Sequence, residues 1–423
     1  MRWMSVWLGL LTWACGPLAW GQAPATNLTL DAMVAEAVRV NPAVQSSRYR
    51  RAALQERVAQ QQALPNPMFK YGGMDLADRG NWPDTNEKRF MVEQEFPWFG
   101  KRGLRGRAAA KEAEALQREV EALERDVIMM VKENYFDLYA VQRARVITRA
   151  EEDVLQHMEQ IAETRFATGQ RTEQDVLKAQ AEITMLQQKR LELEQQETTL
   201  KAKLNQLLNR RADAPLGLAA APPVAAAEAE AGTLFALAET NRPEIKGAQA
   251  QLERQQAERE LMKKEFFTDY RLGVEYRNFG ESPDMVMFTV GIDLPIWQRK
   301  YRAGVREADN LVAASRAALE ATRRQTAFEV QDARFKLLTA RRTLDLYQRT
   351  LIPQAEARFT ASEAGYRTGK VDFLDLLESE RFLLNARVMA AMAAGNLGMQ
   401  GARLERAVGT DLKPALETGE KSP

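Results

Sequence analysis

The stretch Gly365-Tyr-Arg-Thr-Gly-Lys-Val-Asp-Phe-Leu-Asp-Leu-Leu-Glu-Ser-Glu380 decides the fold. A helical pattern runs to Thr368, and Gly369 can adopt the left-handed backbone conformation that ends a helix. Asp372 can cap the following helix, and Asp375 lies in the first turn of that helix, where a negative charge is favourable. The sequence therefore predicts a tight turn between two long helices.

The same turn occurs a second time, roughly 200 residues earlier. The stretch Phe166-Ala-Thr-Gly-Gln-Arg-Thr-Glu-Gln-Asp-Val-Leu-Lys-Ala-Gln180 aligns with it without a gap. The matched pairs are Gly169 with Gly369, Thr172 with Asp372, Asp175 with Asp375 and Leu177 with Leu377. A self-match at a long period indicates a duplicated architecture.

The composition argues against several classes of function. Charged residues make up 28% of the 423 residues and the net charge is +1, so no polybasic segment indicates nucleic-acid binding. After the N-terminal region, no apolar run reaches the roughly 20 residues that a transmembrane helix needs. The chain has one cysteine and one histidine, and it has no nucleophile elbow or phosphate-binding glycine loop. We therefore expect no enzymatic activity, no catalytic residue, no cofactor and no dedicated metal site.

The N-terminus has the pattern of an export signal. A basic start, a short apolar core and the small-x-small sequence Ala19-Trp20-Gly21 predict a secretory signal peptide over residues 1–21. Cleavage there would remove Cys15 and leave a mature chain without cysteine. Lipidation of Cys15 is the alternative, although the bulky Trp13 fits a lipoprotein site poorly.

The mature chain divides into two halves. The expected segments are a first structural repeat over 22–210, a linker rich in alanine and proline over 211–231, a second repeat over 232–410 and a flexible tail over 411–423. Each half is expected to contain a short helix, a pair of strands, a very long helix, the turn and a further long helix. The short helices end near Asn41-Pro42 and Pro243.

The long helices carry apolar residues at coiled-coil spacing. These are Leu116, Val120, Leu123, Val127 and Met130, then Leu186, Leu193, Leu200 and Leu207, and in the second half Val330, Leu337, Leu344 and Leu351. A helix from Leu104 to Thr168 would span roughly 95 Å, so it needs neighbouring helices to bury its narrow seam. Pro353 is expected to kink the second-half helix.

Strands with alternating apolar and polar residues lie at about 66–97 and 269–295. Strands of about 10 residues with this alternation are typical of transmembrane β-barrels. The side chains expected to face lipid are Tyr270, Leu272, Val274, Phe288, Val290 and Ile292. Met91 and Met287 would face the interior, where thioethers suit Cu(I), but gap-filling is the favoured interpretation. His157 is expected to be an ordinary surface residue.

Four strands per chain are too few for a closed barrel, which needs about eight or more. An open sheet edge is not tolerated in lipid, so several copies must share one barrel. The alternative is a periplasmic coiled-coil scaffold with soluble hairpins. The export signal, the coiled coils and the aromatic residues near strand ends favour the barrel. These aromatic residues are Trp82, Trp98, Tyr276 and Trp297.

Five motifs occur in order along the chain. They are Leu28-x-Leu-x-x-x-Val-x-x-Ala-Val-x-x-Asn-Pro42, Pro65-Asn-Pro67, Pro97-Trp-Phe-Gly-Lys-Arg102, Leu294-Pro-Ile-Trp297 and Tyr366-x-x-Gly369-x-x-Asp372-x-x-Asp375. Their order and duplication resemble the outer-membrane efflux channel family of Gram-negative bacteria, the TolC-like channels. The resemblance covers essentially the whole mature chain.

This resemblance implies a mainly α fold with a small membrane β part. It implies a homotrimer in the outer membrane, with a shared 12-stranded barrel and a long antiparallel coiled-coil α-barrel in the periplasm. Such channels form the exit duct of tripartite efflux pumps, with a periplasmic adaptor (membrane fusion) protein and an inner-membrane exporter, here expected to be proton-driven. The run Phe96-Pro-Trp-Phe-Gly-Lys-Arg102 looks most like the branch that serves heavy-metal cation exporters. Drug or protein export is the alternative.

The resemblance also implies site residues at the turns. Asp372 and Asp375 match the aspartates that form a constricting ring at the periplasmic end of such channels, and a ring of carboxylates would select cations. Simple helix capping is the alternative for both, and it is the favoured interpretation for Thr172 and Asp175. The residues implied to contact the adaptor are Arg165, Thr168, Gly169, Arg367, Thr368 and Gly369.

Overall fold

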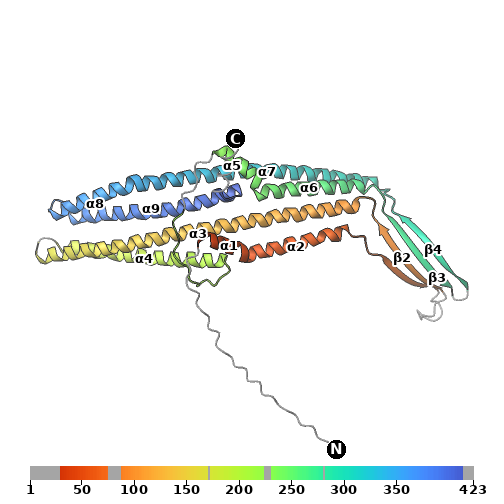
Figure 1. The fold of residues 1–423 in the computed structure, drawn as a ribbon, viewed down its shortest axis with the longest axis horizontal. Helices are drawn as coiled ribbons and strands as arrows, with labels where there is room; N and C mark the ends of the chain where they lie inside the picture. Colours follow the sequence, from red (N-terminus) through yellow and green to blue (C-terminus); the bar gives the residue numbers. More distant parts are fainter. Residues whose placement is uncertain (1–28, 75–86, 170–171, 223–229, 280–281, 413–423) are drawn as a thin grey trace, which may run out of the picture.

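The computed structural model describes residues 29–74, 87–169, 172–222, 230–279 and 282–412. The molecule is long and narrow, with a β-sheet at one end and the turns of two helical hairpins at the other (Figure 1). The expected signal peptide, Cys15, Trp82, part of the expected linker and nearly all of the expected tail lie outside the described residues.

The two halves have the same order of elements, except that the long helix after the strand pair is continuous in the first half and interrupted in the second. The first contains α1 (Leu30–Val40), α2 (Pro42–Gln62), β1 (Met68–Met74), β2 (Glu87–Phe96), α3 (Lys101–Ala167) and α4 (Glu173–Leu207). The second contains α5 (Ala231–Asn241), α6 (Pro243–Lys264), β3 (Tyr270–Phe279), β4 (Ser282–Ile292), α7 (Gln298–Leu346), α8 (Ile352–Arg367) and α9 (Phe373–Val408). The predicted duplication and the mainly α fold are confirmed.

The prediction of one helix before each strand pair is wrong, because each half has two. The break between α1 and α2 is a single residue, Asn41. Its side-chain oxygen accepts hydrogen bonds from the N–H groups of Ala43 and Val44 at 3.0 and 3.4 Å. Pro42 then occupies the first position of α2, where a missing N–H costs nothing.

The breaks at Asn41 and Arg242 tie each repeat together. The Asn41 amide donates to the Leu207 carbonyl at the end of α4, at 3.2 Å. In the second half, the buried Arg242 separates α5 from α6, and it donates to the Ala407 carbonyl near the end of α9, at 3.1 Å. In both halves, therefore, the residue between the first two helices donates a hydrogen bond to a backbone carbonyl at or near the end of the last helix.

The predicted seams are buried between helices. Val120, Val127, Leu186, Leu193, Leu200, Val330 and Leu337 are buried, Leu116 is half-buried, and Leu123, Met130, Leu207, Leu344 and Leu351 pack against the buried clusters. The helix α3 contacts α2, α4, α6 and α9, so it forms the spine of the molecule. This confirms the coiled-coil prediction.

Pro353 lies in the first turn of α8, directly after a π-helical turn at Tyr347–Leu351. Proline cannot donate to the carbonyl four residues earlier, at Arg349, and its ring crowds that carbonyl. A wider turn relieves this conflict. The predicted irregularity therefore takes the form of a π-helical turn.

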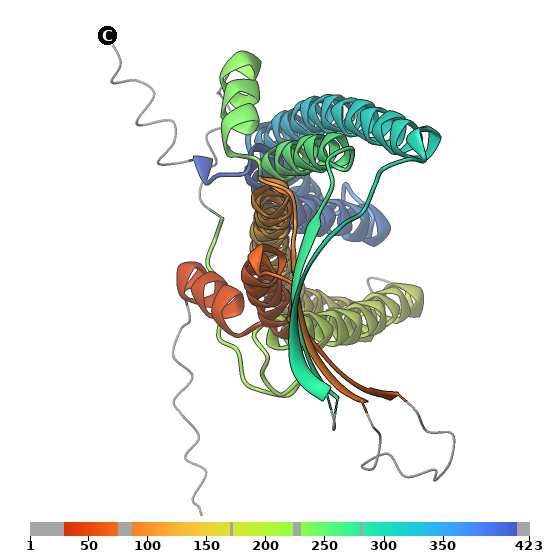
Figure 2. The same ribbon diagram turned by 90° about the vertical axis from the view of Figure 1, so that its right-hand side faces the viewer.

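The four strands form one antiparallel sheet in the order β1-β2-β3-β4. They sweep across the end of the helical part (Figure 2). The strand β4 starts at Ser282 and includes Pro283. Proline is tolerated there because β4 is an edge strand. Over the described ranges, no helix combines the length and apolarity needed to cross a membrane.

Candidate functional site

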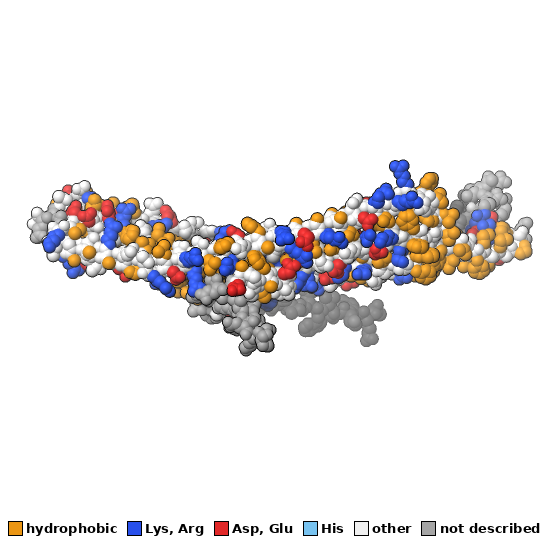
Figure 3. Space-filling view, turned by 90° about the horizontal axis from the view of Figure 1, so that it is seen from above, with side chains coloured by type: hydrophobic (Ala, Val, Ile, Leu, Met, Phe, Trp, Pro, Cys, Tyr) orange, Lys and Arg blue, Asp and Glu red, His pale blue; other side chains and the backbone are white. Residues whose placement is uncertain are grey.

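One face of the sheet is apolar and exposed. Phe288 is 78% exposed, Val290 75% and Ile292 59%, and neighbouring positions on the other strands follow the same alternation. These neighbours include Tyr71, Phe90, Val92, Leu272, Val274 and Tyr276. Hydrophobic side chains accordingly dominate the sheet end in Figure 3. An apolar patch this large needs lipid or another protein to cover it.

Tyr270 lies at the end of this apolar face. Its side chain is half-buried, unlike the exposed side chains above. Its ring stacks on Phe96 at 5.6 Å between centroids and lies 6.4 Å from the ring of Phe99. The apolar face therefore continues past the sheet through Phe99, which is 72% exposed.

The opposite face of the sheet is charged. Its ion pairs are Lys70–Glu93 at 3.6 Å, Arg89–Glu87 at 2.7 Å, Arg277–Glu275 at 2.6 Å and Arg271–Asp293 at 2.6 Å. Met91 and Met287 lie on this face, on either side of Glu275 in the strand register. One apolar and one charged face suit a wall between lipid and water.

Val290→Arg is expected to destabilise the folded protein in a bilayer by about 1–3 kcal/mol, because the cost of a lipid-facing arginine is about 2–4 kcal/mol at mid-membrane and falls toward the interface, and Val290 lies two residues from the end of β4. The reason is the desolvation of a guanidinium group in hydrocarbon. The measurement is denaturant unfolding in lipid vesicles. Met287→Arg is the matched control, because it adds the same charge to the opposite face of the same strand, next to Glu275. Equal stability of the two variants would contradict a lipid-facing Val290.

The two turns have the predicted backbone. Gly169 and Gly369 have φ values of 70° and 75°, in the left-handed region that favours glycine. The Thr168 hydroxyl donates to the carbonyls of Thr164 and Arg165, at 3.1 Å each. The Thr368 hydroxyl makes the equivalent bonds in the second hairpin. All four of these turn residues are exposed at the tip of the molecule.

The two turns differ in their acidic residues. Asp372 caps α9 by accepting a hydrogen bond from the Phe373 N–H at 2.8 Å, and Asp375 follows in the first turn; both are exposed. In the first hairpin, Asp175 is buried. Thr172 occupies the N-cap position of α4, as expected, but within the described part of this turn its side chain makes no capping hydrogen bond. The exposed pair of aspartates is therefore specific to the second hairpin.

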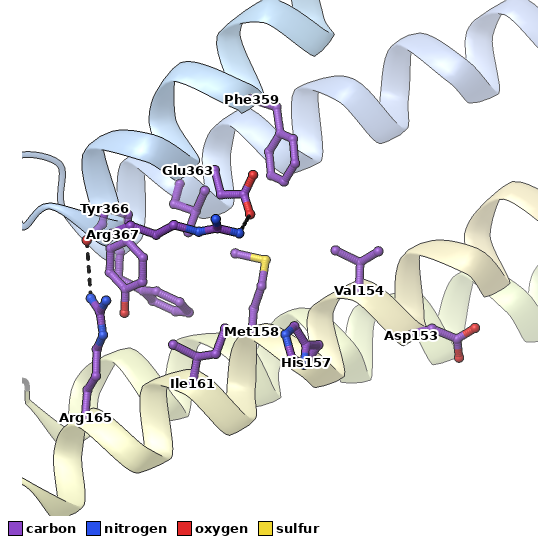
Figure 4. Close-up of a pocket in the computed structure, with 12 residues that line it drawn as sticks. Asp153, Val154, His157, Met158, Ile161, Arg165, Phe359, Glu363, Tyr366 and Arg367 are labelled. Carbon is purple, nitrogen blue, oxygen red and sulfur yellow. Dashed lines mark hydrogen bonds and ion pairs between the residues drawn. The ribbon is translucent and has the colours of Figure 1, made fainter.

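A groove of about 410 Å³ separates the two hairpins near their tips (Figure 4). Arg165 reaches across it from α3, donates to the Tyr366 carbonyl at 3.3 Å and lies 4.4 Å from the centre of the Tyr366 ring. Arg367 pairs instead with Glu363 on its own helix, at 2.6 Å. His157 is exposed at the side of the groove. Arg165 therefore joins the hairpins, whereas Arg367 is mostly exposed.

A buried lysine joins the sheet to the helices, and sequence reasoning missed it. Lys101 is 2% exposed and pairs with Asp269 at 2.9 Å and Glu265 at 3.5 Å. It also donates to the Phe267 carbonyl at 3.0 Å. A cation in the first turn of a helix is electrostatically unfavourable. The position of Lys101 directly after Gly100 was therefore the signal that the sequence offered.

A pair of buried carboxyl groups joins α3 to α9 and was also missed. Glu151 and Glu380 are 4% and 3% exposed, and their carboxyl groups lie close enough to interact. Burial, followed by the interaction with Glu380, raises the pKa of Glu151 to about 9, and Arg387 opposes this shift. The signal in the sequence was an acid at a seam position, because Glu151 lies between the buried Thr148 and Leu155.

Known proteins share this architecture. A family model described as outer membrane efflux protein matches residues 33–210 and 234–410. The cobalt-zinc-cadmium resistance protein CzcC of Cupriavidus metallidurans is 25% identical over 397 residues, which cover 90% of each chain. The pyoverdine export outer membrane protein OpmQ of Pseudomonas aeruginosa is 25% identical over 83% of this chain and 74% of its own length.

The solved structure of the outer membrane protein VceC of Vibrio cholerae superposes with a TM-score of 0.76 at 18% identity, and the match covers 90% of this chain and 96% of that one. This similarity supports the fold. The family model matches twice, once in each half, and the two matches make up most of the sequence. The chain therefore belongs to the outer membrane efflux protein family, a family of transport channels of the Gram-negative outer membrane rather than of enzymes.

Proposed function

We propose that the protein is the trimeric exit duct of a tripartite efflux pump. Three copies would close a 12-stranded barrel in the outer membrane, and their helices would form a tunnel through the periplasm. The single observation that carries this proposal is the four-stranded sheet, with one exposed apolar face, one charged face and an edge strand on each side. Sheet edges must be paired in lipid, and neighbouring copies supply partners for β1 and β4.

The tips are the proposed docking surface for a periplasmic adaptor protein, which an inner-membrane exporter would supply with substrate. The proposed contact residues are Arg165, Thr168, Gly169, Arg367, Thr368 and Gly369, which gather at the end of the molecule farthest from the sheet (Figure 1). Thr168, Gly169, Thr368 and Gly369 are exposed, as is Arg367, whereas Arg165 is partly occupied by Tyr366. Side chains at the tip can meet a partner without disturbing the buried seams.

Asp372 and Asp375 are the proposed gate. In a threefold assembly they would form two rings of carboxylates at the periplasmic end, which attract cations and repel anions. Asp372→Ala/Asp375→Ala is expected to raise single-channel conductance several-fold and to reduce cation selectivity. The measurement is current through the purified protein in planar bilayers.

The control for the gate is Glu173→Ala, which removes an exposed first-turn acid from the other hairpin. This variant is expected to conduct like the wild type. If the double aspartate variant also conducts like the wild type, the aspartates only cap α9. If a well-folded wild-type trimer does not insert at all, the periplasmic scaffold is the better interpretation.

Heavy-metal cations are the proposed substrate class. The support is the similarity to CzcC, whose name is a cobalt-zinc-cadmium resistance protein, over 90% of both chains. Loss of the protein is expected to lower cellular tolerance to divalent heavy metals. The similarity to OpmQ, a pyoverdine export protein, favours export of organic molecules as the alternative. Unchanged metal tolerance together with lost export of an organic compound would favour that alternative.

A further inference from the structure

The first two turns of α7 carry a cluster of exposed cations. Arg299, Lys300, Arg302 and Arg306 are all exposed, and no acid occurs in the helix before Glu307. Within the described part of the chain, Arg299, Arg302 and Arg306 form no ion pair. The nearby Asp309 is held by Arg259 of α6 at 2.6 Å. These three guanidinium groups are therefore available to an external anion.

The three arginines share one side of the helix. At 100° per residue, Arg299, Arg302 and Arg306 fall within an arc of about 60°, whose centre lies about 120° from the side that packs on α6. That packed side includes the half-buried Tyr301 and Val305 and the buried Ala308. We call Arg299, Arg302 and Arg306 the α7 arginine stripe.

The apolar sheet face leads directly to this stripe. Beyond the end of β4 at Ile292, exposed apolar side chains continue with Leu294 and Ile296, each 65% exposed, and with Trp297, which is 72% exposed. Trp297 is the residue immediately before α7. Exposed aromatic rings next to arginines match the boundary between the hydrocarbon and the headgroups of a bilayer.

The length of the strands places this boundary. The strands β3 and β4 have 10 and 11 residues. At about 3.3 Å per residue and a tilt of about 45°, they would cover roughly 25 Å, which matches the apolar band of an outer-membrane barrel. Trp297 then lies at the headgroup level on the helical side of the membrane, and the arginine stripe lies just beyond it.

We propose that Trp297 and the α7 arginine stripe bind anionic phospholipids in the periplasmic leaflet of the outer membrane. Guanidinium groups bind phosphate oxygens through paired hydrogen bonds, and the net positive charge favours lipids with a net negative charge over zwitterionic ones. The inference rests on the proposed function, because it requires the sheet to span the membrane with the helices in the periplasm.

The first repeat has a similar arrangement at the start of α3. Phe99 is exposed, and Arg102, Arg105 and Arg107 follow it with no acid before Glu112. Arg102 is partly occupied there, because it donates to the Gln62 carbonyl at 2.6 and 2.8 Å. The α7 stripe is therefore the stronger lipid site of the two.

The test uses the whole protein in vesicles of phosphatidylcholine that contain a small amount of spin-labelled phosphatidylglycerol or spin-labelled phosphatidylcholine. Electron paramagnetic resonance measures the relative association of each label with the protein. The wild type is expected to prefer phosphatidylglycerol. The variant Arg299→Gln/Arg302→Gln/Arg306→Gln is expected to lose at least about fivefold of this preference, because about fivefold (roughly 1 kcal/mol) is the contribution expected of a single surface cation.

Two variants serve as controls. Arg316→Gln/Arg324→Gln removes two exposed cations from a part of α7 farther from the sheet, and it is expected to keep the preference. Arg299→Lys/Arg302→Lys/Arg306→Lys retains the charge and is expected to keep most of the preference. Equal binding of the two labels by the wild type, or identical behaviour of the triple glutamine variant and the Arg316/Arg324 control, would overturn the inference.

Competition with inorganic phosphate distinguishes a lipid site from a site for free phosphate. Excess inorganic phosphate at constant ionic strength is expected to leave the lipid preference unchanged. If phosphate abolishes it, the stripe binds free phosphate and the assignment to lipid is wrong. Bilayer conductance separates this inference from the proposed function: a protein that conducts but shows no lipid preference loses only the lipid site.

Discussion

Lys101→Met is expected to lower the free energy of unfolding by about 3–5 kcal/mol. Methionine keeps most of the volume of the lysine side chain, but it lacks the buried ammonium group. Asp269 is 19% exposed at its side chain and would lose its partner at 2.9 Å. The Phe267 carbonyl would lose its bond from the ammonium group at 3.0 Å. Removing one member of a buried pair costs more than the pair itself contributes, because the other charge stays buried.

The position of Lys101 makes this loss specific to one junction. Asp269 also accepts a hydrogen bond from the Trp98 N–H at 2.6 Å, so it joins the start of β3 to the turn between β2 and α3. Gly100 has a φ of 85°, and this left-handed residue turns the chain sharply into α3. The sheet is therefore expected to detach from the helices at lower denaturant than the helices themselves unfold.

Denaturant unfolding followed by tryptophan fluorescence measures this, because Trp98 lies at the junction and stacks on Phe267 at 5.4 Å. Arg102→Met is the matched control, since it removes the neighbouring cation, which lies nearer the surface and, among the described residues, bonds to the Gln62 carbonyl alone. It is expected to cost less than about 1 kcal/mol. If Lys101→Met lowers the free energy of unfolding by a similarly small amount, water reaches the junction and solvates the Asp269 carboxylate in place of the lysine.

The features that depend on local spacing could be predicted from the sequence. The turn at Gly369 needs only a residue that tolerates positive φ, and the seam through Leu193 and Leu200 needs only a repeat of seven. The alternation around Val290 likewise follows from the period of a strand. Each of these features repeats in the second half or continues over several positions, so the signal exceeds chance.

The features that depend on contacts between distant segments could not be predicted. The helix α2 carries few apolar side chains and, among its described residues, buries only Val44, so it has no seam. Its contact with α3 instead includes an ion pair between Arg48 and Glu124, at 2.7 Å. Likewise, the bond from Arg242 to the Ala407 carbonyl joins residues 165 positions apart. No local pattern reveals which charged residue will find such a partner.

The wild-type protein is expected to lose stability as pH rises because of Glu151. The variant Glu151→Gln is expected to lack this loss. The folded-state pKa of Glu151 is raised to about 9, mainly by burial and also by Glu380. In the unfolded chain the carboxyl titrates near 4.5, so between these values the folded state binds the extra proton. The contribution of this site is therefore fully present below pH 4.5 and falls by up to about 1.4 kcal/mol per pH unit until pH 9.

Glutamine keeps the shape of the protonated acid and can donate from its amide to Glu380. The variant is therefore expected to gain stability relative to the wild type as pH rises from 4.5 to 7.5, by an amount on the order of a few kcal/mol per chain. The measurement is the midpoint of thermal or denaturant unfolding over this range of pH. Glu378→Gln is the matched control, because it removes an exposed carboxyl two residues from Glu380.

The location of the pair gives this pH dependence a structural consequence. Glu151 belongs to the first hairpin and Glu380 to the second, and both lie in the part of the molecule that leads to the tips. A second negative charge between α3 and α9 would push the two hairpins apart, and only Arg387 opposes it among the charges that act on Glu151. Alkaline pH is therefore expected to loosen the hairpins of the wild type before the sheet end. If Glu151→Gln and the wild type lose stability in parallel across this range, the pair is solvated in solution and does not hold the hairpins together.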